Sequence, residues 1–379
     1  MTVFVQECAL GSANGLRVAI KDSIDIQGMP TRMGSAALAQ AAPAVEHAEV
    51  VALLLEAGCH IVGKTNLHEF AFGVSGINAV FGTPLNHRYP DLVPGGSSSG
   101  SAAAVAAGDA DIALGTDTGG SVRVPAACCG VYGFKPSFDR VSRQGVWPAR
   151  TSLDCVGPFA ADLAQLERAQ AWIDPSFEAV PFCGELSIGL VSVDANASIS
   201  KAVADYVAAS GCDVAAVELP LLEAAFEAGL AVINAEAWGA FGAYVETGLV
   251  GADVAARLRN AANTGQQALA QAEQVRRDFR AEVDAMLARY SVLVLPTLPD
   301  FPLLLADALA GKTDIRSTAL VRPFNLSGHP ALTIPLEIDG RPAGIQLVGR
   351  HDQDALLFAA ARELERRVTA YNNKHQRSA

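Results

Sequence analysis

The sequence is poor in basic side chains and has no long apolar run. Its 28 Lys and Arg are outnumbered by 40 Asp and Glu, which gives a formal net charge of −12. Broad binding to a nucleic-acid backbone needs clustered Lys and Arg, so this balance argues against it. No apolar run approaches the roughly 18 residues of a membrane helix, and no secretory leader pattern opens the chain. We therefore expect neither a nucleic-acid nor a membrane partner.

The seven cysteines lack the Cys-x-x-Cys spacing that is typical of zinc and redox sites. Cys128 and Cys129 are neighbours in an apolar run, which is typical of buried free thiols. This pattern favours a reducing, cytoplasmic setting. We expect no metal and no other cofactor.

Half of the 379 residues are apolar, which is enough for a substantial core in one large domain or two ordinary ones. Beyond residue 185, strand and helix patterns alternate. Leu186–Val193 predicts a strand, Ser198–Ser210 a helix and Asp213–Val217 another strand. Such alternation is typical of an α/β fold with parallel strands. It leaves open whether this region forms a subdomain or continues one sheet.

Two glycine–serine clusters lie close together, GGSSSGS at 95–101 and GGS at 119–121. Glycine lets the backbone approach a ligand closely, and the serines beside it place hydroxyl groups there. A flexible linker is the alternative explanation. The apolar segments Ala102–Ala107 and Asp111–Leu114 between the clusters argue against a linker. We therefore take the two clusters as the candidate site of chemistry.

Two short motifs match known patterns but lack the structural context that those patterns need. Gly58–Thr65 fits the phosphate-loop pattern GxxxxGK[ST], which requires a strand before its first glycine. Here a helical pattern precedes it, and Cys59–Val62 is itself a strand candidate. Gly96–Gly100 fits GxSxG, which requires a strand that runs into it, but a proline-rich loop precedes this segment. Nucleotide binding remains the alternative from a different functional class.

Within Val93–Ser137, the segments PGGSSSGSAAAVAAG and GTDTGGSVRVPA resemble the amidase signature family of Ser-cisSer-Lys amidohydrolases. VAIKDSID at 18–25 resembles the segment that carries the family's lysine, and GKTNLHEFAFG, FNLSGHPALTIP and AGIQLVGR extend the resemblance. It implies a single large α/β domain over 1–379. The implied central sheet is mixed, mostly parallel and covered by helices on both faces. We expect a signature core at about 15–160, a looser middle region at about 185–290, and a C-terminal sheet and helix at about 291–372.

The resemblance also implies which residues act. Ser121 matches the nucleophile that forms an acyl-enzyme, Ser97 the bridging serine on a cis peptide bond, and Lys21 the general base. A lysine acts as a base only when neutral, and burial favours that form. The oxyanion-hole candidates are Thr118, Gly119, Gly120 and Ser121, and the substrate-binding candidates are Phe72, Gly73, Ser98 and Trp147. For Trp147, a place in the core is an equally good interpretation.

Other residues near the clusters receive structural interpretations. Ser121 is expected to open a helix, whose N-terminal partial charge favours negative charge there. Asp117 and Arg123 are expected to pair and hold the loop. His68 and Glu69 are expected on a helix surface.

These residues predict hydrolysis of the C–N bond of a small carboxamide to a carboxylate and ammonia or an amine. The signature segments are similar to those of indole-acetamide-type amidases, so an aryl-acetamide is the first substrate hypothesis. The alternative is the glutaminase-type subunit of a tRNA-dependent amidotransferase complex, although the chain is shorter than such subunits usually are. Many relatives place a helical segment ahead of the lysine, and none precedes Lys21. This difference leaves open whether the protein forms a homodimer and how its pocket is entered.

Overall fold

The computed structural model describes residues 2–376, so residues 1 and 377–379 of the expected domain lie outside it. Eleven strands of this range form one sheet, in the order β1-β3-β2-β4-β6-β5-β10-β11-β9-β7-β8. The strands are β1 (Phe4–Gly11), β2 (Arg17–Lys21), β3 (His60–Thr65), β4 (Ile112–Asp117), β5 (Tyr132–Lys135), β6 (Cys155–Ala160), β7 (Ser187–Val191), β8 (Asp213–Val217), β9 (Val292–Pro296), β10 (Ala331–Ile338) and β11 (Arg341–Val348). The helices are α1 (Glu49–Glu56), α2 (Ser99–Ala107), α3 (Arg123–Cys129), α4 (Leu163–Ile173), α5 (Ala197–Ala209), α6 (Leu222–Val245), α7 (Ala252–Ala261), α8 (Gln266–Leu287), α9 (Leu305–Leu309), α10 (Arg322–Leu326) and α11 (Asp354–Gln376), with 3-10 turns η1 (Ala36–Leu38), η2 (Glu69–Ala71) and η3 (Ile315–Thr318).

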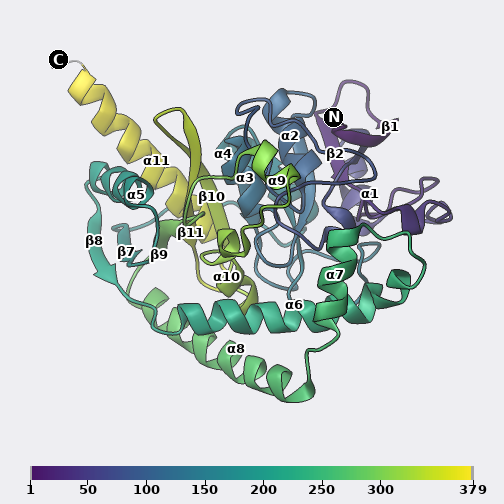
Figure 1. Cartoon of the computed structure of the whole chain (residues 1–379). Helices are drawn as coiled ribbons and strands as arrows, with labels where there is room; N and C mark the ends of the chain where they lie inside the picture. Colours follow the sequence, from purple (N-terminus) through teal and green to yellow (C-terminus); the bar gives the residue numbers. More distant parts are fainter. Residues whose placement is uncertain (1, 377–379) are drawn as a thin grey trace.

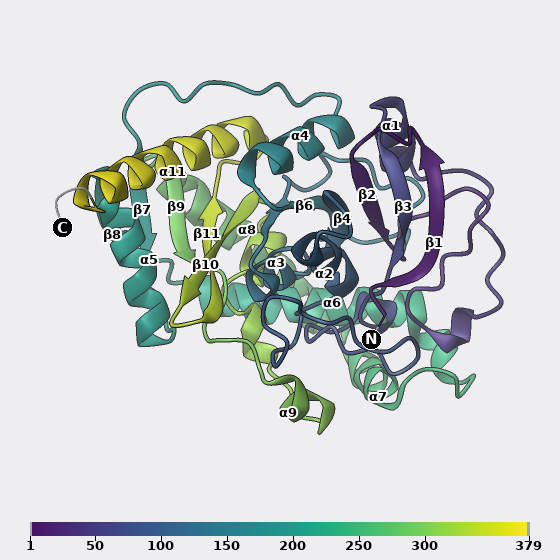
Figure 2. The same ribbon diagram turned by 90° about the horizontal axis from the view of Figure 1, so that it is seen from above.

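Helices cover both faces of the sheet (Figures 1 and 2). In β9, Val292 and Val294 belong to the apolar cluster under α4, α5 and α11. Leu293 and Leu295 belong to the cluster under α6, α8 and α10. This alternation follows from the pleat, which points successive side chains to opposite faces. The prediction of an α/β domain with helices on both faces is confirmed.

The sheet is mixed as predicted, but it is not mostly parallel. In the described range β2 pairs parallel with β3 and β4, and β7 pairs parallel with β8 and β9. The central run β4-β6-β5-β10-β11-β9 is antiparallel throughout, as is β1 with β3. The hairpin of β10 and β11 closes through Asp339 and Gly340, both at positive φ, and such a short connection permits only antiparallel strands. Strand–helix alternation describes the flanks of the sheet and not its centre.

The middle region continues the sheet instead of forming a subdomain. Strand β7 pairs with β9, which pairs in turn with β11. The charged stretch after residue 252 folds as the two helices α7 and α8, and α8 runs alongside α6 in Figure 1. No sequence motif predicts strand β1. Within residues 2–376, no helix combines the length and the apolar character needed to span a bilayer.

Close approaches between backbone segments position the glycine–serine clusters. A Cβ atom on Gly100 of α2 would lie 2.6 Å from the carbonyl oxygen of Asn66, and one on Gly115 of β4 would lie 2.6 Å from Ser98 Oγ. Only glycine permits these contacts. Because β2 and β4 are parallel neighbours, their carboxyl ends meet at the same edge. The loop before α2 is held against that edge.

Candidate active site

Lys21 and Ser97 meet in the interior of the protein. Lys21 ends strand β2, and its Nζ donates to Ser97 Oγ over 2.8 Å. Nζ also donates to Thr116 Oγ1 over 2.8 Å and to the Thr116 carbonyl over 3.4 Å. Lys21 and Ser97 are both fully buried. The three acceptors match the three N–H groups of an ammonium, so they fix the lysine in one position.

Burial controls the charge of this lysine. It lowers the pKa of Lys21 to about 7, although the carboxylates of Asp154 and Asp117 favour the charged form. An ordinary lysine is almost entirely charged at neutral pH. Near pH 7, a large fraction of Lys21 is therefore the neutral amine, which is the form able to accept a proton.

The loop before α2 presents Ser97 to the lysine. The Gly96–Ser97 peptide bond is cis, as the resemblance implies. The Ser97 carbonyl accepts a hydrogen bond from the His68 amide over 3.0 Å. The neighbouring Ser98 is buried. Its hydroxyl donates to the Thr116 carbonyl and accepts a hydrogen bond from the Thr116 amide. Ser98 thus joins the loop to β4.

Ser121 lies beside this loop and lines a cavity of about 390 Å³. Its carbonyl accepts a hydrogen bond from the Ser98 amide over 3.3 Å. Within the described residues its hydroxyl has no hydrogen-bond partner. The expectation that Ser121 opens a helix is wrong, because α3 begins at Arg123 after the cap residue Val122. The nucleophile candidate therefore sits in the turn that follows β4.

The four backbone amides predicted for an oxyanion hole are not equivalent. The amide of Gly120 donates to Asp117 Oδ1 over 2.7 Å. Those of Thr118, Gly119 and Ser121 make no hydrogen bond within residues 2–376. Thr118, Gly119 and Ser121 also line the cavity. Three residues with unengaged amides, one of them Ser121 itself, therefore line the same cavity.

Asp117 and Arg123 form a buried pair that holds the turn, as expected. Arg123 Nε and Nη2 donate to Asp117 over 3.0 and 2.9 Å, and both side chains are fully buried. Burial alone would raise the pKa of Asp117, but Arg123 and Asn325 outweigh it and hold that pKa well below its usual range. Arg123 also donates to Asn325 Oδ1, Gln346 Oε1 and the Val321 carbonyl. The carboxylate and its arginine are both fully satisfied.

Two of the four substrate-binding candidates line the cavity of Ser121, and two do not. Phe72 and Gly73 line the cavity of Ser121. Gly73 lies against the His68 ring, where a Cβ atom would come within 2.0 Å of Nε2. Ser98 does not line this cavity, and neither does Trp147. Of the four candidates, only Phe72 and Gly73 therefore share a cavity with the nucleophile candidate Ser121.

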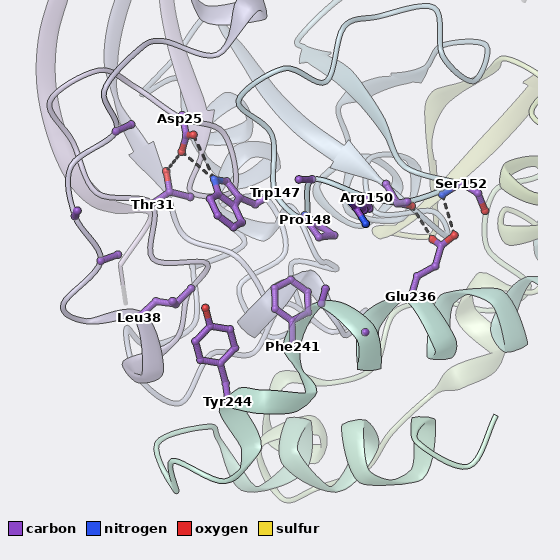
Figure 3. A pocket seen from close by; sticks show the side chains of 17 residues that line it. Asp25, Thr31, Leu38, Trp147, Pro148, Arg150, Ser152, Glu236, Phe241 and Tyr244 are labelled. Carbon is purple, nitrogen blue, oxygen red and sulfur yellow. Dashed lines mark hydrogen bonds between the residues drawn. The ribbon is translucent and has the colours of Figure 1, made fainter. Parts of the chain in front are cut away.

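Trp147 belongs to a second cavity, of about 830 Å³ (Figure 3). Its Nε1 donates to Asp25, which also accepts a hydrogen bond from Thr31 Oγ1. Across the cavity, Glu236 on α6 accepts from Thr151 Oγ1 and from the Ser152 amide. Later turns of α6 line this second cavity, whereas its residues 230–234 line the cavity of Ser121.

Several residues near the site are not found by sequence reasoning. Thr116 holds both Lys21 and Ser98, but its position inside a strand gives no signal in the sequence. Arg322, the first residue of α10, lines the cavity from a distant part of the chain. His68 and Glu69 are buried, so their expected place on a helix surface is wrong. Burial lowers the pKa of His68 to about 4. Across the described residues, no cluster of three or more His, Cys, Asp or Glu is arranged to bind a metal ion.

Comparison with known proteins gives consistent relatives over nearly the whole chain. A glutamyl-tRNA(Gln) amidotransferase subunit of Halobacterium salinarum is 34% identical, over 94% of this chain and 96% of the relative. Amidase 1 of Oryza sativa subsp. japonica is also 34% identical, over 93% of this chain and 90% of the relative. A solved crystal structure of an amidase superposes with a TM-score of 0.84 at 31% identity, over 93% of this chain and 84% of that one. The Amidase family model matches residues 6–358, and the chain belongs to the amidase signature family of amidase-type hydrolases.

Proposed function

We propose that this protein hydrolyses the C–N bond of a carboxamide through an acyl-enzyme on Ser121. The observation that carries the proposal is the buried contact of 2.8 Å between Lys21 Nζ and Ser97 Oγ. A base with a pKa near the working pH is well suited to general acid–base catalysis, and burial lowers the pKa of Lys21 to about 7. In this proposal Ser97 links the lysine to Ser121.

The proposed first step transfers two protons and forms one bond. With Lys21 neutral, its lone pair faces Ser97 while its two N–H groups remain bonded to Thr116. Ser97 passes its proton to Lys21 and takes the proton of Ser121, whose oxygen attacks the carbonyl carbon. Reversal of this relay protonates the departing nitrogen as the C–N bond breaks. Water then hydrolyses the acyl-enzyme by the same relay and releases the carboxylate.

The negative charge of the tetrahedral intermediate needs fixed donors. We assign them to the backbone amides of Thr118, Gly119 and Ser121, which have no other partner in the described structure. Gly120 is left out of this assignment, because its amide is engaged by Asp117. In this role, Gly120 and Asp117 fix the shape of the turn that aims the other amides.

The substrate of this chemistry has two candidate classes. The first is a small free carboxamide, with the protein acting alone or as a homodimer in the cytoplasm. The second is glutamine, with this chain as the glutaminase-type subunit of a complex that contains other chains. Glutamyl-tRNA(Gln) amidotransferase subunits recur among the relatives, which favours the second class. Because the match spans 96% of the relative from Halobacterium salinarum, chain length does not count against it.

Ammonia release from a panel of primary amides tests the chemistry. The panel includes indole-3-acetamide, benzamide, malonamide and glutamine. Turnover of any member should fall by about 10³-fold or more in Ser121→Ala, Ser97→Ala and Lys21→Ala. Ser142→Ala is the matched control, since its exposed hydroxyl bonds only Glu49 and the backbone of its own turn. Unchanged turnover in Ser121→Ala would refute the acyl-enzyme.

The two substrate classes are separated by a second measurement. Purification of the tagged chain from its native cells, followed by identification of bound chains, tests the complex. Stable partner chains together with glutamine hydrolysis would establish the glutaminase alternative. An isolated chain that turns over other amides but not glutamine would exclude it.

A further inference from the structure

Arg322 is a buried arginine without a hydrogen-bond partner in the described structure, although the carboxylate of Glu227 is near enough to favour its charged form. The residue is only 5% exposed, and its Nε and Nη1 atoms are buried with no hydrogen bond in the described structure. The guanidinium stacks on the Phe226 ring, with 4.3 Å from Cζ to the ring centroid. Such stacking attracts a cation but leaves its N–H groups free. Arg322 therefore retains donors that nothing in the described chain accepts.

A comparison with Arg123 shows that the lack of hydrogen bonds at Arg322 is unusual for a buried arginine. Arg123 is also buried, and it bonds two side-chain amides, a backbone carbonyl and the carboxylate of Asp117. Buried charges in proteins are normally paired in this way, because an unpaired one is costly. Burial lowers the pKa of Arg322 to about 10, so the side chain is still charged at neutral pH. A buried charge that is kept without hydrogen bonds is a mark of a functional site.

Arg322 faces the cavity that contains Ser121. It lines this cavity together with Gly119, and a Cβ atom on Gly119 would lie 3.5 Å from Arg322 Nε. The guanidinium is therefore next to the turn that carries the nucleophile candidate. A ligand held at Ser121 lies within the same cavity.

The two ionisable side chains that line this cavity carry charge of the same sign. The ionisable residues that line it are Arg257 and Arg322, and none of the described lining residues is Asp or Glu. Arg257 is partly exposed and has a carboxylate 3.7 Å away, that of Asp253. The cavity thus favours an anionic ligand. It offers no lining carboxylate for the ammonium of an amino acid such as glutamine.

We propose that Arg322 binds a carboxylate on the acyl part of the substrate, so that the enzyme selects the monoamide of a dicarboxylic acid. This inference rests on the proposed function, because it places the amide at Ser121. When ammonia is the leaving group, only the acyl part can carry the anionic group. The planar guanidinium is well suited to two parallel hydrogen bonds with a carboxylate. Arg322 is then a specificity-determining residue.

Binding to the Ser121→Ala protein tests the inference without turnover. The probes are malonamate, succinamate and glutaramate, measured by titration calorimetry beside pentanamide, which is a neutral counterpart of glutaramate. At least one anionic probe should bind more tightly than pentanamide. In Ser121→Ala/Arg322→Gln its affinity should fall by about 100-fold, while that of pentanamide stays the same. Arg322→Lys keeps the positive charge but lacks the paired N–H donors of the guanidinium, so its affinity for the anionic probe should be intermediate.

Several results would overturn the inference. If all three anionic probes bind no better than pentanamide, no carboxylate is recognised, and this comparison needs no change at Arg322. If Arg322→Gln weakens neutral and anionic probes alike, Arg322 is not selective for the carboxylate. If Arg257→Gln removes the anionic preference and Arg322→Gln does not, the assignment to Arg322 is wrong. L-Glutamine differs from glutaramate only by its ammonium, so tighter binding of glutamine would reject the proposed class.

The test also separates this inference from the proposed catalytic chemistry. Turnover of an anionic amide by the unaltered protein, lost in Ser121→Ala, supports the acyl-enzyme whatever the Arg322 variants do. Anionic binding that depends on Arg322, with no loss of turnover in Ser121→Ala, would support the binding site and reject the acyl-enzyme.

Discussion

Lys21 Nζ donates to the Thr116 hydroxyl over 2.8 Å, at a point where neither residue is exposed to solvent. Burial favours the neutral form of this lysine, whereas the carboxylates of Asp154 and Asp117 favour the charged form. The balance places the pKa of Lys21 at about 7. A buried lysine held by neutral acceptors and influenced by two carboxylates thus has a pKa close to physiological pH.

The first prediction concerns the pH dependence of activity. Because the proposed base is neutral Lys21, kcat/KM should rise as pH increases through about 7 and level off above it. The rise should follow the loss of a single proton. Initial rates between pH 5 and 9 check this, with circular dichroism as a control for folding. A profile that is flat from pH 6 to 8 would exclude Lys21 as the titrating base.

The second prediction concerns Thr116 as a positioning residue. Thr116→Val removes the hydroxyl with little change of volume, so Lys21 should lose both an anchor and a stabilising partner of its charged form. The rate should fall by about tenfold, and the midpoint of the pH profile should move to lower pH. Thr116→Ser keeps the hydroxyl and should restore both. A rate loss without a midpoint shift would indicate a purely structural role.

The third prediction concerns the stability given by the Asp117–Arg123 pair. Arg123→Met leaves the fully buried Asp117 without its cation and should lower the free energy of unfolding by about 3–5 kcal/mol. The control is Arg17→Met, whose partner is Asp111 and whose side chain is 44% exposed. That exposed pair should contribute less than about 1 kcal/mol. Urea unfolding of both variants measures the difference, and equal losses would contradict the assignment.

The fourth prediction is a gain in stability at the expense of function. Arg322→Met removes a buried charge whose Nε and Nη1 make no hydrogen bond, and it keeps a flexible side chain against the Phe226 ring. The free energy of unfolding should rise by about 1–2 kcal/mol. Arg257→Met, at a partly exposed arginine that has a carboxylate nearby, should change it by less than about 0.5 kcal/mol. A lower free energy of unfolding in Arg322→Met would contradict this prediction, because it would mean that interactions of the guanidinium stabilise the fold.

The sequence predicts those parts of the protein that depend on local pattern. The apolar run Leu186–Val193 predicts a strand, and β7 spans Ser187–Val191 because these residues fit a buried strand. The glycine–serine clusters likewise mark the loops that carry Ser97 and Ser121. Such signals come from neighbouring residues, so no tertiary structure is needed to find them.

Other features depend on contacts between distant segments. The antiparallel centre of the sheet follows from which strands become neighbours, as when β5 pairs with β10 about 200 residues later. Trp147 follows a signature segment in sequence but faces a separate cavity. Arg322 reaches the turn that contains Gly119 and Ser121 from α10, and no motif marks it as part of the site. Composition and spacing do not determine these relationships.

The Asp117–Arg123 pair has a consequence for how the enzyme is made. Arg123 takes its remaining partners from Val321, Asn325 and Gln346, which lie about 200 residues further along the chain. During synthesis the ribosome completes the turn around Ser121 long before these residues emerge. The nascent chain therefore carries Ser121, the proposed nucleophile, in a turn whose supporting contacts are still incomplete. We therefore expect this turn to reach its final geometry only after the distant partners of Arg123 have joined the fold.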